Sequence, residues 1–261
     1  MTPLSLFMLV AVGCGAGIFG ALAGVGGGIV ITPVLTMYAG LPIHQAIGVS
    51  LVAVIATSTA SSSVHMERQT TDMRLGMTLE LATTIGAGVA AVIAGYINRR
   101  TLAVLFVCFL LYSASSLAIK AWRSRAEVHS QDIPTYEVKH YPFGMLASLF
   151  AGAFSGLLGV GGGVIKVPMM YMLMGIPLRV ATATSNFMIG VTAATSAYIY
   201  YGRGDVNIAY AGPVVAGVFA GSLFGARIAP RVHSKYVLGL FLAITLWMAG
   251  QMMIRIVGGR L

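Results

Sequence analysis

Two glycine-rich stretches are the residues of this chain whose types and spacing most clearly suggest chemistry. Residues 24–28 and residues 159–163 both read GVGGG, and each stretch is followed by a proline, Pro33 or Pro168. Four glycines in five residues disfavour a continuous helix, because glycine loses more backbone entropy than any other residue. A helix that begins just after such a break offers free backbone N–H groups and a positive dipole end to an anion. We therefore interpret the two stretches as the halves of an anion site that includes Gly26, Gly27, Gly28, Gly161, Gly162 and Gly163.

Lys166 is the single residue that adds most to this interpretation. It follows the second stretch by three positions and is the only charged residue between Tyr141 and Leu178. A lysine near the bilayer centre costs about 2.5–3.5 kcal/mol on insertion scales, and no carboxylate lies nearby in the sequence. We expect an anionic substrate to offset this charge; the alternative is a side chain that extends to the interface or is neutral. The equivalent residue of the first stretch is Ile31, so the expected site is asymmetric.

Small polar residues follow each stretch and extend the candidate site. Most serines and threonines in membrane helices bond to their own backbone, so few of them are candidates for contacts with an anion. The best candidates are Ser50 and Ser185, which occupy equivalent places in the two halves, with Thr184 and Asn186 beside the second serine. Arg179 either anchors the end of its segment or supplies a second cationic contact.

The remaining titratable residues of the apolar segments are weaker candidates. His44 and His65 lie near segment ends, where interface positions are expected, and the alternative for each is proton or substrate binding. Glu80 enters its segment about one turn in, so it either flanks an interface or carries a proton.

The elements that position these residues are apolar segments long enough to cross a bilayer. Of the 261 residues, 57% are hydrophobic and only 9% are charged, whereas soluble domains carry about 25% charged residues. The apolar runs are continuous, which argues against a β-barrel. We predict an all-α polytopic protein of the cell (inner) membrane with about 8–10 membrane segments. The segments lie near residues 4–24, 28–40, 43–65, 75–97, 101–121, 142–159, 163–175, 178–201, 206–226 and 234–256, and those that follow the glycines are half-helices.

The two halves of the chain resemble each other at a constant offset. Adding 135 to the number of Phe19, Leu22, Ser50, Thr57 or Arg68 gives the same residue type in the second half. We predict two homologous repeats, 1–121 and 142–261, joined by a charged linker over 122–141. Five crossings in each half would make the repeats inverted, and four would make them parallel; the paired broken helices favour inversion. The distribution of basic residues does not separate these alternatives, but it places the linker in the cytoplasm in both.

The chain resembles the TauE/SafE sulfite-exporter family in the motif GVGGG-x₄-P, which occurs in each half and is followed by G-[LI]-P and then A-x₃-S. The family's second motif commonly reads Thr-Ser, which Thr184 and Ser185 match and which Val49 and Ser50 match only in part. The resemblance implies a secondary transporter that exports or imports small anions, typically sulfite or organosulfonates such as sulfoacetate.

The leading functional hypothesis is therefore a secondary transporter that works by alternating access, without a cofactor or a bound metal. The partners that we expect are a small anion, the lipid bilayer, and a proton or sodium as the coupling ion; a homodimer is compatible, and nucleic acid is not expected. The alternatives are a passive anion channel and a permease for another small organic or inorganic anion. An intramembrane hydrolase, with Ser155 as nucleophile and His65 or His233 as base, is disfavoured because no acid–base constellation is evident. We expect no enzyme activity.

Overall fold

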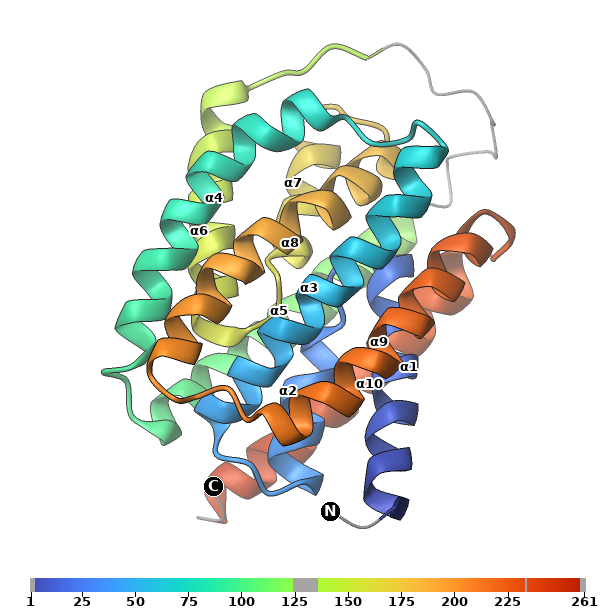
Figure 1. Ribbon diagram of the computed structural model, residues 1–261. Helices are drawn as coiled ribbons and strands as arrows, with labels where there is room; N and C mark the ends of the chain where they lie inside the picture. Colours follow the sequence, from blue (N-terminus) through green and yellow to red (C-terminus); the bar gives the residue numbers. More distant parts are fainter. Residues whose placement is uncertain (1–2, 124–135, 233, 259–261) are drawn as a thin grey trace.

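Ten α-helices make up most of the chain that the computed structural model describes, which is residues 3–123, 136–232 and 234–258 (Figure 1). The first half contains α1 (Pro3–Ala23), α2 (Gly28–Tyr38), α3 (Ile43–Glu67), α4 (Met73–Ala94) and α5 (Arg99–Arg123). The second half contains α6 (Tyr141–Leu158), α7 (Gly163–Met172), α8 (Leu178–Gly202), α9 (Ile208–Ile228), the 3₁₀ turn η2 (Ala229–Arg231) and α10 (Ser234–Val257). The all-α architecture predicted from the sequence is confirmed.

Seven of the described helices are long and apolar enough to cross a membrane: α1, α3, α4, α5, α6, α9 and α10. Helix α8 is as long as α3, at 25 residues, but is not among the seven. Helices α2 and α7 have only 11 and 10 residues, about half of what a crossing requires. The protein is thus a multi-pass membrane protein, and its seven spans, α8 and two half-helices account for the expected segments.

The linker expected over 122–141 falls mainly on residues 124–135, which lie outside the described residues. Helices α4 and α5 begin two residues before the expected positions, at 73 rather than 75 and at 99 rather than 101, and a side chain caps each of them. Helix α9 begins two residues after the expected position, at 208 rather than 206, and α1 and α6 each begin one residue early. The carboxylate of Asp72 accepts a hydrogen bond of 3.0 Å from the first turn of α4, and the amide oxygen of Asn98 accepts one of 2.7 Å from the first turn of α5. Such caps satisfy N–H groups that a helix leaves unpaired at its start.

Glycine contacts hold the two halves together. The long helices pack as the pairs α1 with α9, α4 with α6, α3 with α8 and α5 with α10, so each pair contains one helix from each half. A side chain at Gly217, Gly221 or Gly225 of α9 would collide with the backbone of α1. Gly152 and Gly156 of α6 meet the backbone of α4 in the same way. Their small-xxx-small spacing therefore serves close helix packing, as predicted.

Helices α1 and α6, the first of each half, run in opposite directions: α1 begins at the lower end of Figure 1 and α6 at the upper end. Opposite directions are what inverted repeats require, and parallel repeats would require the same direction. The duplication itself stays a prediction.

One arginine in each half caps a helix of the other half. After α3, Arg68 donates hydrogen bonds of 3.0 and 3.1 Å to the last carbonyls of α9. After α8, Arg203 donates to the carbonyl of Ala91 in the last turn of α4 and to the carboxylate of Asp205, and lies 4.2 Å from the ring centre of Tyr200. A cation at a helix C-terminus is favourable because it offsets the negative end of the helix dipole.

We expect Arg203→Ala to lower the free energy of unfolding by about 1–2 kcal/mol, because a charge-assisted hydrogen bond and a cation–π contact are lost together. Thermal unfolding in detergent would measure this change. Arg231, which is exposed, provides the matched control, and Arg231→Ala should leave the melting temperature unchanged. Equal melting temperatures for the two variants would contradict a capping role for Arg203.

Candidate functional site

Both glycine-rich stretches interrupt a helix, as the sequence predicts. Helix α1 ends at Ala23 and α2 begins at Gly28, while α6 ends at Leu158 and α7 begins at Gly163. Between them the backbone is left-handed, with φ of 75°, 88° and 75° in the first break and 70°, 85° and 73° in the second. Left-handed φ is strained for residues with a side chain. The residues with these angles are Gly24, Gly26, Gly27, Gly159, Gly161 and Gly162.

The two breaks lie directly against each other in the interior of the protein. A side chain on Gly28 would collide with the carbonyl oxygen of Gly159, and one on Gly163 would collide with the carbonyl oxygen of Gly24. All of these glycines are buried. The first turns of α2 and α7 therefore meet at one place, although they are 135 residues apart in the sequence. In each turn, two backbone N–H groups donate to the carbonyl of the glycine that precedes the helix, Gly27 or Gly162.

Ser50 and Ser185 bond across this junction. The hydroxyl of Ser50 on α3 donates to the carbonyl of Gly159 (2.8 Å), and the hydroxyl of Ser185 on α8 donates to the carbonyl of Gly24 (2.9 Å). Each serine thus binds the break of the other half of the chain. In this state their hydroxyl protons are engaged by carbonyls, and their role as anion contacts stays a prediction.

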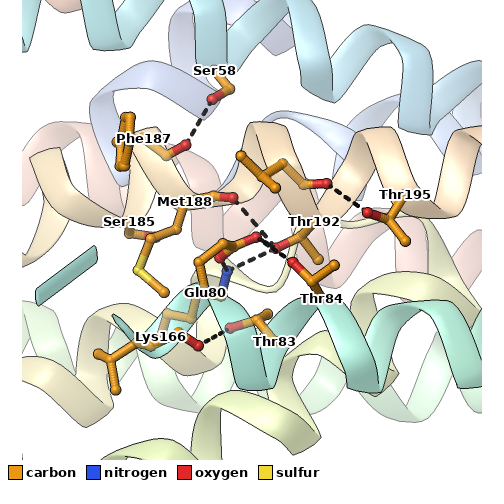
Figure 2. A network of polar contacts seen from close by, with 12 residues as sticks. Ser58, Glu80, Thr83, Thr84, Lys166, Ser185, Phe187, Met188, Thr192 and Thr195 are labelled. Atoms are coloured by element: carbon orange, nitrogen blue, oxygen red, sulfur yellow. Dashed lines mark hydrogen bonds and ion pairs between the residues drawn. The ribbon is translucent and has the colours of Figure 1, made fainter. Parts of the chain in front are cut away.

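Lys166 lies in the first turn of α7 and is part of a buried polar network (Figure 2). Its side chain has no exposed surface, and its ammonium donates to the carboxylate of Glu80 on α4 (3.1 Å) and to the hydroxyl of Thr192 on α8 (3.0 Å). The other oxygen of Glu80 accepts hydrogen bonds from Thr192 and, at 3.4 Å, from Thr84. Three helices therefore supply one ion pair with two hydroxyl partners.

Sequence reasoning did not expect Glu80 beside Lys166. Glu80 was expected either to flank an interface or to carry a proton; the structure buries it, with 6% exposed, and makes it the counter-ion of Lys166. Its role as a proton carrier stays a prediction. A usable signal existed, because Glu80 is the only acidic residue of α4 and Lys166 the only charged residue of α7. Opposite charges inside membrane segments usually pair with each other. The binding of an anion by Lys166 stays a prediction.

The other predicted site residues surround the junction at different distances. Thr184 accepts a hydrogen bond from the backbone N–H of Asp72 (3.0 Å), and Asn186 donates to the carbonyl of Ala21 near the end of α1 (3.1 Å). Both are fully buried. Arg179 is exposed in the first turn of α8, six residues before Ser185, which is about 9 Å along a helix. The structure thus brings the two serines to the breaks and leaves Arg179 at the surface.

The histidines and Ser155 do not assemble into a catalytic group in the described part of the chain. A ring nitrogen of His65 lies 3.4 Å from the amide nitrogen of Asn186, and its other nitrogen lies 3.5 Å from the hydroxyl of Thr70. The ring of His44 lies 3.2 Å from the carbonyl of Ala94 at the end of α4. The hydroxyl of Ser155 is buried and has no hydrogen-bond partner among the described residues. His233, the other candidate base, lies outside the described residues.

The sequence is similar to those of known membrane transporters. The sequence profile described as "Sulfite exporter TauE/SafE" matches residues 9–252. The chain is 30% identical to the probable membrane transporter protein YunE of Bacillus subtilis (strain 168), over 96% of this chain and 98% of that protein. It is 29% identical to a probable membrane transporter protein of Methanocaldococcus jannaschii, over 92% and 96% of the two chains. A shorter stretch is 33% identical to Sulfite exporter TauE/SafE family protein 1 of Arabidopsis thaliana, over 34% of this chain and 20% of that protein. No solved structure gives a significant match.

Proposed function

Because the chain belongs to the TauE/SafE sulfite exporter family, we propose that it is a secondary transporter of a small anion in the cell (inner) membrane. Sulfite and organosulfonates such as sulfoacetate are the first candidates for the anion. The linker between α5 and α6 faces the cytoplasm in this proposal. The anion is held between the first turns of α2 and α7, with Lys166 as its cationic contact.

The observation that carries this proposal is the junction of the two helix breaks. Broken helices at membrane depth are tolerated only where they are buried in protein or line a cavity. Here two half-helices begin at one buried place, so two positive dipole ends converge there. Lys166 lies in the first turn of α7, and its ammonium extends to Glu80 on α4 and Thr192 on α8. Hydrogen-bond donors and positive charge that are shielded from water favour the binding of an oxyanion.

The contact between the breaks also supports alternating access. As long as Gly28 lies against Gly159 and Gly163 against Gly24, an anion has no room between them. The breaks must separate before it enters, and that movement frees the hydroxyls of Ser50 and Ser185 from their carbonyl partners. Each hydroxyl can then donate to the anion. The serines thus close the site in one state and bind the substrate in another.

Counterflow of labelled sulfite in proteoliposomes tests the proposed function. We expect vesicles loaded with unlabelled sulfite or sulfoacetate to accumulate external label, and initial rates to saturate with concentration, because a site that must close around each anion has a limiting turnover. Sulfate and protein-free vesicles provide the specificity and leakage controls. Flux that rises linearly with concentration and shows no counterflow would contradict a transporter and indicate the passive channel.

A further inference from the structure

We propose that the Glu80–Lys166 pair couples anion transport to a proton: Glu80 binds a proton when the anion replaces it as the counter-ion of Lys166. This inference rests on the proposed function of anion transport and names its coupling ion. Its basis is the network of Figure 2, in which the ammonium of Lys166, the proposed contact of the anion, is already paired with the carboxylate of Glu80.

Charge balance in a buried site is the first part of the argument. Lys166 has no exposed surface and the side chain of Glu80 only 7%, so their charges interact with little screening by water. One ammonium balances one carboxylate. An anion that arrives beside Lys166 adds an uncompensated negative charge, and buried charges without partners are strongly unfavourable. Protonation of Glu80 removes one negative charge and leaves the ammonium free to hold the anion.

On the helices that pack around Glu80, no other charged group in the described part of the chain lies where it could neutralise the charge of the arriving anion. Glu80 lies in the second turn of α4, whose packing partners are α6, α8 and, through the ion pair, α7. Helix α6 carries one titratable residue, Tyr141, at its first position. Helix α8 carries Arg179 in its first turn, 13 residues or about 20 Å from Thr192. The remaining titratable residues of these elements lie at helix ends: Arg74, Tyr171, Tyr198, Tyr200 and Tyr201.

Thr192 allows the network to satisfy both protonation states of Glu80. Its hydroxyl now donates to Glu80 and accepts from Lys166, and the carbonyl of Met188 lies 3.3 Å away as a second acceptor. When Glu80 is protonated, its O–H can donate to Thr192, which then turns its own proton to Met188. A hydroxyl that donates and accepts in turn avoids an unsatisfied buried group in either state. Thr192 is a positioning residue in this scheme.

The coupled step moves one proton and forms no covalent bond with the anion. With the site open to one side, a proton adds to a carboxylate oxygen of Glu80 as the anion enters beside Lys166. With the site open to the other side, the anion leaves, the proton dissociates to water and the ion pair re-forms. An anion and a proton therefore cross in the same direction, in a ratio of one to one.

Proteoliposomes with a pH dye inside test this proposal with sulfoacetate, whose sulfonate group does not cross the membrane as a neutral acid. We expect wild-type uptake of sulfoacetate to acidify the interior by one proton per anion. An outside pH one unit below the inside pH should raise accumulation by up to about tenfold at unchanged membrane potential. For Glu80→Gln, which mimics the protonated state, we expect exchange of sulfoacetate that no longer responds to the pH gradient.

Two further measurements keep the proposal open to refutation if Glu80→Gln does not fold. The dye signal of the wild-type protein needs no variant, and uptake without acidification would overturn the proposal. Thr192→Val should lower the proton-to-anion ratio, whereas Thr195→Val, one turn further along α8, should keep the wild-type ratio. Accumulation driven by a sodium gradient without proton movement, or by a pH gradient in Glu80→Gln, would also overturn it.

A wild-type protein that exchanges none of sulfite, sulfoacetate and sulfate would refute the proposed function itself.

Discussion

Replacement of Lys166 by methionine is expected to abolish sulfite exchange and to destabilise the protein. The loss of exchange follows if the ammonium is the cationic contact of the anion. The loss of stability follows from the structure, because the carboxylate of Glu80 would stay buried without its counter-ion. Removal of one partner from a buried ion pair costs about 3–5 kcal/mol. Counterflow and thermal unfolding in detergent measure the two effects separately.

The double variant Lys166→Met/Glu80→Gln separates a role in binding from a role in folding. It removes both charges and keeps the size of both side chains, so most of the lost stability should return, as is common when buried ion pairs are replaced together. Exchange should stay absent, because no cation is left at the site. Wild-type exchange rates in the double variant would show that the ion pair is purely structural and would contradict anion binding by Lys166.

Ile31 offers the matched control, because it is the equivalent residue of α2 and is also fully buried. Ile31→Met keeps an apolar side chain of similar size, and such exchanges usually cost less than about 1.5 kcal/mol. We expect this variant to retain exchange. An equal loss in Ile31→Met and Lys166→Met would indicate a packing effect rather than the loss of a charge.

The helix breaks could be predicted from the sequence because their cause is local. Glycine density determines where the backbone leaves the helical conformation, and the residues on either side carry the apolar pattern of membrane segments. The short half-helices α2 and α7 followed from the same reasoning. The caps by Asp72 and Asn98 were local too, and attention to them would have placed two helix starts correctly.

The ion pair could not be predicted with equal ease because its cause is tertiary. Glu80 and Lys166 are 86 residues apart and meet only because α4, α7 and α8 converge. The same holds for Ser50 and Ser185, whose equivalence was visible in the sequence but whose bonds to the opposite break were not. What the sequence did contain was the sign of each charge and its isolation within an apolar segment. Two isolated, opposite charges inside membrane segments usually pair with each other. An analysis that considers only residues close in the sequence does not find such a pair.

Replacement of Gly163 by alanine is expected to lower stability by about 1–3 kcal/mol and to abolish exchange, although the change adds a single methyl group. Gly163 begins α7 and is not among the glycines with positive φ, so alanine strains no backbone angle there. The new methyl group would, however, collide with the carbonyl oxygen of Gly24 and force the two breaks apart. Ser185 would then lose its bond to that same carbonyl.

Gly250 of α10 is the matched control for this test of the junction, since a methyl group there meets no atom within 4 Å. Gly250→Ala should keep exchange and the melting temperature, or raise stability by up to about 1 kcal/mol through helix propensity. Thermal unfolding in detergent and counterflow, carried out on both variants, isolate the steric effect from the helix-propensity effect. If Gly163→Ala melts and exchanges like Gly250→Ala, the breaks do not touch in the membrane, and the anion site cannot be the place where the two half-helices begin.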